Sequence, residues 1–182
     1  GSDIHIAFDD CTPYGVSHEA AKHSMQRTHR WAKRSLDEHL RLATQYEGKP
    51  YQALYGSIQG SVYEDLRIES AKYIASLPFD GIAIGGVSVG ESKNEMRRVL
   101  EWVVPHLPED KPRHLLGVGE IDDIFTLAEY GMDTFDCVQP TRLARMGRLF
   151  RKGEQDHQLD VTKAMEGKKD EPIDTQCHCP VC

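Results

Sequence analysis

The sequence predicts an α/β fold in which parallel strands alternate with helices. An apolar, β-branched run followed by a helical pattern recurs about every thirty residues, and a polar or glycine residue follows each apolar run. Parallel strands end at one edge of a sheet, so these residues are expected to gather there, where ligands bind. Five units are too few for a closed barrel, which needs eight strands and roughly 250 residues. An open sheet and part of a longer barrel therefore both remain possible.

The expected strands are short apolar runs that end at polar or glycine residues. They are IHIAF, ALYGSIQG, FDGIAIGG, HLLGVG and MDTFDCV. The expected helices occupy residues 19–42 and the stretches VYEDLRIESAKYIASL, ESKNEMRRVLEWVVPHL and IDDIFTLAEYG. The first is rich in Ala, Lys, Arg, Met and Leu and is broken by EGKP. After Phe150 the sequence is polar and has no clear period, which predicts a linker or excursion over 151–182.

Composition narrows the class of protein. The 182 residues are 28% charged and 39% hydrophobic, as in soluble globular chains, and no apolar run is long enough for a membrane span. The net charge of −7 argues against a surface that attracts nucleic acid everywhere, so RNA contact would need a local basic patch. Five cysteines, three of them clustered, argue against a secreted disulfide framework. A reducing cytoplasm is expected.

The stretch FDCVQPTRLARMG holds candidates for chemistry and for RNA contact. Asp136, at a strand end, could be a nucleophile or base, although a carboxylate there could also only cap a turn. Arginines recur every three residues at Arg142, Arg145, Arg148 and Arg151. They predict either a phosphate-binding stripe or a solvated charged face.

Two further segments could line a pocket. Asp9 and Asp10 are neighbours in an extended segment, so their side chains should point to opposite sides and not form a shared acid pair. GIAIGGVSVGE matches neither the phosphate-loop nor the dinucleotide fingerprint. Its glycines would let a flat ligand approach the backbone, or would simply form a tight turn.

The chain ends in CHCPVC, which has the ligand-like spacing C-x-C-x2-C. Cys177, Cys179 and Cys182 would supply three thiolates to a tetrahedral zinc ion, and a structural zinc site takes four protein ligands. Three free thiols or a disulfide is the alternative. Zinc is favoured, because the spacing suits a metal and the compartment is expected to be reducing.

These motifs stand in one order along the chain: FDDCTPY, RWAKRS, GSIQGSVYEDLR, FDGIAIGGVSVGE, LPEDKPRHLLGVG, GMDTFDCVQPTR and CHCPVC. Through them the chain closely resembles the tRNA-guanine transglycosylases, which exchange a guanine in tRNA for a 7-deazaguanine. The resemblance covers nearly the whole chain except the polar excursion. It implies an irregular (β/α)8 TIM barrel, with its central and later units in residues 1–150. Residues 151–182 would lead into an inserted zinc-binding subdomain.

The resemblance assigns the base pocket and the nucleophile to residues of this sequence. The aspartate of the FDCV motif, Asp136, would attack C1′ of the ribose at the wobble guanine and form a covalent ester. Asp9 would accept hydrogen bonds from N1–H and the 2-amino group of guanine. Gln59 and the Gly86 amide would donate to O6.

Other positions are implied to shape the pocket and contact RNA. The Val87 carbonyl, with Glu91 behind it, would face the substituent at position 7 of the base, and Leu116 would cover one face of the base. Arg142 and Arg145 would contact the anticodon loop, which carries a U-G-U stretch read as splayed single-stranded bases.

The resemblance also implies a zinc cofactor and a homodimer. The fourth zinc ligand would be a histidine beyond Cys182. The family's second aspartate and the aromatic residue that stacks on the base would precede the first residue. These 182 residues alone are therefore expected to be inactive in exchange and to bind zinc poorly.

The physiological base is expected to be 7-aminomethyl-7-deazaguanine, because Val89 and Cys11 are types typical of the bacterial pocket. Queuine is the alternative, favoured by Val87 in place of leucine and by the ESK that follows the glycines. Two other readings stay open. One is a non-catalytic homologous subunit, which the presence of the pocket and nucleophile residues disfavours. The other is a zinc-stabilised RNA-binding module without chemistry.

Overall fold

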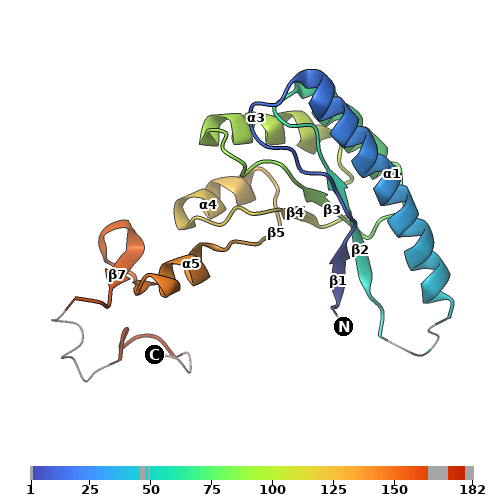
Figure 1. Cartoon of the computed structure of the whole chain (residues 1–182). Coiled ribbons are helices and arrows are strands. Elements are labelled where there is room, and N and C mark those ends of the chain that lie inside the picture. The colour runs from blue at the N-terminus through green and yellow to red at the C-terminus, as the bar shows by residue number, and fades with distance from the viewer. Residues whose placement is uncertain (1, 46–47, 49, 164–171, 179–182) are drawn as a thin grey trace. The chain divides into compact units, whose positions relative to one another are not determined.

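A computed structural model gives the structure of the chain and describes residues 2–45, 48, 50–163 and 172–178. The chain divides into two compact units, Gly1–Asp136 and Cys137–Cys182 (Figure 1). Residues 148–150 pair with the segment that follows them, so they belong to the second unit. Each unit is described by itself below.

The elements alternate as the sequence predicts. The first unit contains β1 (Ile4–Ile6), α1 (His18–Ala43), β2 (Ala53–Ile58), α2 (Glu64–Ala75), β3 (Gly81–Ile84), α3 (Lys93–Val103), the 3-10 turn η1 (Val104–His106), β4 (Arg113–Leu115), α4 (Ile121–Glu129) and β5 (Thr134–Phe135). The second contains α5 (Gln139–Arg145), β6 (Arg148–Phe150), the 3-10 turn η2 (Gln155–His157) and β7 (Gln158–Asp160).

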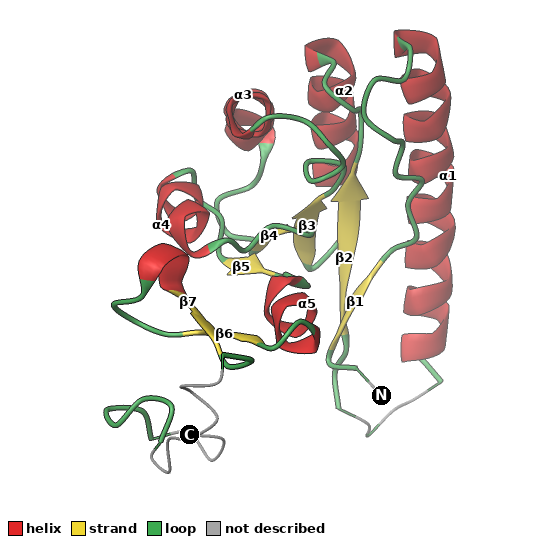
Figure 2. Cartoon of the chain, turned by 60° about the vertical axis from the view of Figure 1, so that its left-hand side comes forward, coloured by secondary structure: helices red, strands yellow, loops and turns green. Residues whose placement is uncertain are grey.

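The five strands of the first unit form one parallel sheet in the order β1-β2-β3-β4-β5 (Figure 2). Each strand thus lies beside the one that precedes it in the chain. A doubly wound sheet reverses its order at a switch point, whereas a β/α barrel does not. The α/β prediction is confirmed, and the sheet is half of a β/α barrel. The predicted start of a zinc subdomain falls largely on 164–171 and 179–182, outside the described residues.

Local sequence sets where the helices begin. The Ser17 side chain accepts the Ala20 amide at the start of α1. At the start of α3 the Ser92 side chain accepts the Glu95 amide while the Glu95 carboxylate accepts the Ser92 amide, a capping box. The capping box fixes the direction in which the chain leaves the glycine-rich loop after β3.

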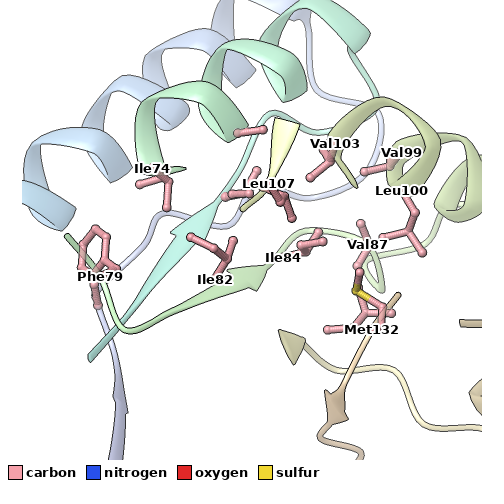
Figure 3. Close-up of a cluster of buried hydrophobic side chains, with 14 of the residues drawn as sticks. Ile74, Phe79, Ile82, Ile84, Val87, Val99, Leu100, Val103, Leu107 and Met132 are labelled. Atoms are coloured by element: carbon pink, nitrogen blue, oxygen red, sulfur yellow. The ribbon is translucent and has the colours of Figure 1, made fainter. Parts of the chain in front are cut away.

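One hydrophobic core joins the sheet to its helices (Figure 3). Ile82 and Ile84 of β3 are fully buried at its centre, and Phe79 is 1% exposed. Side chains from each of the four helices complete it; among them are Leu36, Ile74, Val99, Leu100, Val103 and Leu127. Burying this much apolar surface is the main force that holds the half-barrel together.

Two glycines accommodate aromatic rings where β2 meets β3. A Cβ at Gly56 would lie 2.5 Å from the Phe79 ring, and one at Gly81 would lie 2.5 Å from the Tyr55 ring. Tyr55 and Gly81 are also direct partners in the ladder. No side chain larger than hydrogen fits either position without moving a ring.

The second unit has structure that the sequence did not predict. β6 and β7 pair antiparallel, with Leu149 opposite Leu159. The connection turns at Asp156 and His157, which have φ of 52° and 55°, a conformation that non-glycine residues seldom adopt. None of the helices in the described ranges has the length and apolarity of a membrane span.

Candidate functional site

The ends of β1 and β2 bring a carboxylate and an amide together. Oδ2 of Asp9 accepts hydrogen bonds from Ser57 Oγ at 2.8 Å and from Gln59 Nε2 at 2.6 Å. Gln59 is 2% exposed, so the interaction is shielded from water. Oδ1 of Asp9 has no hydrogen-bond partner in the described part of the chain. This oxygen can accept from a ligand that presents N–H groups.

Asp10 points to a different set of partners. Its carboxylate pairs with Arg27 of α1 at 2.7 Å, and its amide donates to Thr28 Oγ1. Asp9 and Asp10 therefore act separately, as expected for neighbours in an extended segment. Asp10 anchors the β1 segment to α1, whereas Asp9 belongs to the pocket edge.

The segment after β3 passes close to the same amide. A Cβ at Gly85 would lie 2.5 Å from Gln59 Nε2 and 3.1 Å from Asp9 Oδ2. Gly86 has a φ of 64°, and a Cβ there would lie 2.5 Å from Gln59 Oε1. The Gly86 position favours glycine because of its positive φ, and a side chain at either position would displace the amide of Gln59. The backbone thus approaches Gln59 closely, which a flat ligand could exploit.

A buried arginine lies behind this segment. Arg67 of α2 is 0% exposed and donates to the carbonyls of Ser61 at 2.6 Å, Gly85 at 2.6 Å and Gly86 at 2.7 Å. Burial lowers the pKa of Arg67 to about 10, so the guanidinium stays charged at neutral pH. The cation ties the turn after β2 to the loop after β3.

Other predicted pocket residues lie around these groups. Glu91 accepts the Val89 amide at 3.0 Å, whereas the Val87 side chain is buried in the core. Leu116 follows β4 and is half-buried. Cys11 is exposed as a residue, yet desolvation of its thiol, aided by the Asp9 charge, raises the pKa of Cys11. The thiol is therefore a weak nucleophile at neutral pH.

Asp136 lies at the end of β5 with its carboxylate held on one side. Its Oδ1 accepts the Gly117 amide at 2.9 Å and His114 Nε2 at 3.1 Å. The His114 Nδ1 lies 2.8 Å from Thr134 Oγ1. The Asp136 side chain is 54% exposed. A carboxylate with one oxygen fixed and the other facing solvent has the arrangement that a nucleophile or base requires.

The arginine series extends over two elements of the second unit. Arg142 and Arg145 are exposed on α5, one helical turn apart. Arg148 belongs to β6, because the helix ends before Gly147, whose φ is 71°. The second unit thus presents two neighbouring helical arginines, Arg142 and Arg145.

Of the predicted zinc ligands, only Cys177 lies among the described residues. It is exposed and has a free thiol. Cys179 and Cys182 lie outside the described residues. Within the ranges that the structure describes, no group of three potential metal ligands is present.

The structure brings together Asp9, Gln59 and the Gly85–Gly86 segment, and it places Asp136 at the same carboxyl edge of the sheet. Sequence reasoning missed Ser57, Arg67 and His114. His114 could have been found, because it pairs with Thr134 across parallel strands and so lies near Asp136. Arg67 carried no such signal, since an arginine within a helix is usually solvated.

Comparison with known proteins gives one consistent family. The model of the family described as queuine tRNA-ribosyltransferase matches residues 1–182. The chain is 48% identical over 182 residues to a queuine tRNA-ribosyltransferase of Zymomonas mobilis, and 46% and 47% identical to those of a Shewanella species and of Bacillus velezensis. Each alignment covers 100% of this chain but 46%, 46% and 45% of the relative, so the chain spans about half the length of these curated relatives.

Proposed function

Since the chain belongs to the queuine tRNA-ribosyltransferase family, we propose that it carries the base pocket and the nucleophile of a tRNA-guanine transglycosylase. The substrate is a tRNA with a U-G-U anticodon stretch, and the wobble guanine is exchanged for a 7-deazaguanine. The observation that carries this proposal is the set of polar side chains at the carboxyl edge of the sheet. There the Asp9–Gln59 pair and the half-fixed Asp136 follow strands β1, β2 and β5.

The pocket edge suits the hydrogen-bonding pattern of guanine. The Asp9 carboxylate accepts from N1–H and the 2-amino group, which a carboxylate can bind in bidentate fashion. The Gln59 amide retains one N–H beyond its bond to Asp9 and donates it to O6, together with the Gly86 amide. Leu116 covers one face of the base, and the Val87 carbonyl with Glu91 faces position 7.

The exchange proceeds by two displacements at C1′ of the ribose. Asp136 attacks C1′, the C1′–N9 bond breaks with its electron pair going to guanine, and a covalent ester joins RNA to enzyme. The guanine anion takes up a proton. The incoming base gives up its N9 proton and displaces the carboxylate. One glycosidic bond replaces another, so no energy source is required.

The incoming base is 7-aminomethyl-7-deazaguanine, with queuine as the alternative. Cys11 and the 37% exposed Val89 are the residue types that favour the aminomethyl base. A competition assay with both bases decides between them. Saturation by queuine at the lower concentration would contradict this choice.

The full natural chain forms a closed (β/α)8 barrel and acts as a homodimer in the cytoplasm. The barrel is supported by the sequential strand order and by the apolar residues exposed in β1 and just after it, namely Ile4, Ile6 and Phe8 at 50%, 39% and 81%. Cys177, Cys179 and Cys182, with one histidine, would hold a structural zinc ion. When bound, zinc would stabilise the fold of that region and take no part in the exchange.

Labelled-guanine incorporation into tRNA, in the full natural chain, tests the proposal. We expect Asp136→Asn to abolish incorporation and the covalent adduct seen on a denaturing gel. Asp37→Asn, which alters an exposed ion pair with Lys33 on α1, is the matched control and should leave both unchanged. If the wild type binds tRNA without exchange, the chain is a non-catalytic subunit. If it binds RNA without forming any adduct, and Asp136→Asn has no effect on binding, it is a zinc-stabilised RNA-binding module.

A further inference from the structure

Arg67 is a fully buried cation whose hydrogen bonds all go to backbone carbonyls. Four carbonyls lie within reach of its guanidinium, those of Ser61, Gly85 and Gly86 at 2.6 to 2.7 Å and that of Ile58 at 3.5 Å. No carboxylate forms an ion pair with it in the described part of the chain. The Glu91 carboxylate opposes this charge from a distance, without touching the guanidinium. Because the guanidinium itself is fully buried, its charge acts on the carbonyls that it contacts with little screening by water.

The hydrogen bond from Arg67 to the Gly85 carbonyl bears on the donor strength of the next amide. Nη1 of Arg67 donates to the Gly85 carbonyl at 2.6 Å, and that carbonyl belongs to the same peptide unit as the Gly86 N–H. The peptide is trans, so its C=O and N–H point in opposite directions. A charged donor on the carbonyl draws electron density from the nitrogen and strengthens the N–H as a donor on the far side.

A second bond holds the same unit in place. Nη2 of Arg67 donates to the Gly86 carbonyl at 2.7 Å and lies 3.2 Å from the point where a Gly86 Cβ would be. Gly86 keeps its φ of 64° between the guanidinium and the Gln59 side chain. The orientation of the Gly86 N–H is therefore fixed before any ligand arrives.

We propose that Arg67 is a positioning residue that polarises the Gly85–Gly86 peptide, so that the Gly86 N–H stabilises negative charge on O6 of the departing guanine. The inference rests on the proposed function, in which Gly86 donates to O6. As the C1′–N9 bond breaks, its electron pair enters the purine ring and part of the charge reaches O6. A preorganised donor then binds the transition state more strongly than the ground state.

The role of Arg67 is tested in the full natural chain by comparing two Arg67 variants with two bases. Arg67→Gln removes the charge and Arg67→Lys keeps it. Guanine presents O6, whereas 2-aminopurine lacks O6 and the N1 hydrogen. We expect Arg67→Gln to lower kcat for guanine exchange by about tenfold or more and to change KM for tRNA less than threefold. Arg67→Lys should recover most of kcat.

The second measurement is the inhibition constant of each base, for the wild type and for Arg67→Gln. Arg67→Gln should weaken inhibition by guanine and leave that by 2-aminopurine unchanged within about twofold, because only guanine offers O6. An equal loss for both bases would show a purely structural role. An unchanged kcat in a folded Arg67→Gln variant would show that the charge of Arg67 does not contribute to the exchange, and either result would overturn the inference. If the wild type forms no covalent tRNA adduct, the proposed function fails instead, and the two failures are thereby distinguished.

A measurement on the wild type covers the case in which no Arg67 variant folds. Gly85–Gly86 is the only Gly–Gly pair within these 182 residues. Segmental labelling of this part of the full natural chain, with carbonyl 13C and amide 15N glycine, therefore singles out its peptide. A cationic donor on the Gly85 carbonyl should shift the Gly86 amide nitrogen downfield of the random-coil glycine position. A resonance at the random-coil position, unmoved by guanine, would overturn the inference.

Discussion

His114 Nε2 lies 3.1 Å from Asp136 Oδ1. Because a carboxylate only accepts, the proton of this bond is on Nε2, and in a neutral imidazole Nδ1 then accepts from the Thr134 hydroxyl, 2.8 Å away. Thr134 thereby fixes the ring and the ring fixes one oxygen of the carboxylate. The second oxygen is left to attack.

Replacing His114 should slow the chemical step. We expect His114→Phe to lower kcat for guanine exchange roughly tenfold, the effect of losing one hydrogen bond to a charged group. KM for tRNA should stay within about threefold, since the bond orients the nucleophile and not the RNA. Single-turnover formation of the covalent adduct measures this. His114→Gln, which retains an N–H donor, is the control, and a loss as large as that of His114→Phe would contradict the prediction.

The core should depend strongly on Phe79. It is 1% exposed, so Phe79→Ala leaves a cavity and should lower the free energy of unfolding by about 3 to 5 kcal/mol. Phe125 is 75% exposed, and Phe125→Ala should change the free energy of unfolding by less than about 0.5 kcal/mol. Urea unfolding of both variants gives the comparison. Similar losses in the two would mean that the ring of Phe79 is not a core element.

Stability should fall in mild acid because of His29. Burial lowers the pKa of His29 to about 4, while its Nε2 bonds Ser70 Oγ at 3.0 Å. Between pH 6.5 and about 4 the unfolded chain binds a proton that the folded chain does not, so unfolding becomes easier as pH falls through that window. From pH 7 to pH 4.5 the wild type should lose roughly 2 to 3 kcal/mol more than His29→Gln. The exposed His23 provides the control: His23→Gln should follow the wild type.

The two helical arginines should set the salt dependence of tRNA binding. Each phosphate contact releases about one counterion, so Arg142→Ala and Arg145→Ala should each reduce the slope of log K against log salt by about 1. Lys33→Ala, which removes a lysine paired with Asp37 on α1, should leave the slope unchanged. Filter binding at several salt concentrations measures it. An unchanged slope in the α5 variants would exclude them from the RNA interface.

Zinc content should depend on the terminal cysteines. In the full natural chain we expect about one zinc per protomer by native mass spectrometry, and much less in Cys177→Ser. Cys137→Ser, at a half-buried cysteine with no assigned metal role, should keep its zinc. Equal zinc in both variants would exclude Cys177 as a ligand.

The barrel half was predictable because every strand is an apolar run that ends at a glycine or a polar residue, as at Asp9 and Gln59. The second unit was not, because β6 and β7 have three residues each and their turn uses positive φ at Asp156 and His157, not glycine. Arg67 could not be foreseen either. Its burial depends on carbonyls that only the folded sheet brings together.

The ring-over-glycine contacts of β2 and β3 fix more than local packing. If β2 slipped by one residue against β3, the Tyr55 ring would face Asp80 or Ile82 in place of Gly81, and the space above the glycine would stay empty. Every side chain of the slipped strand would also change faces. The two glycines therefore specify the register of β2 against β3. This register places Gln59 at the sheet edge level with Gly85.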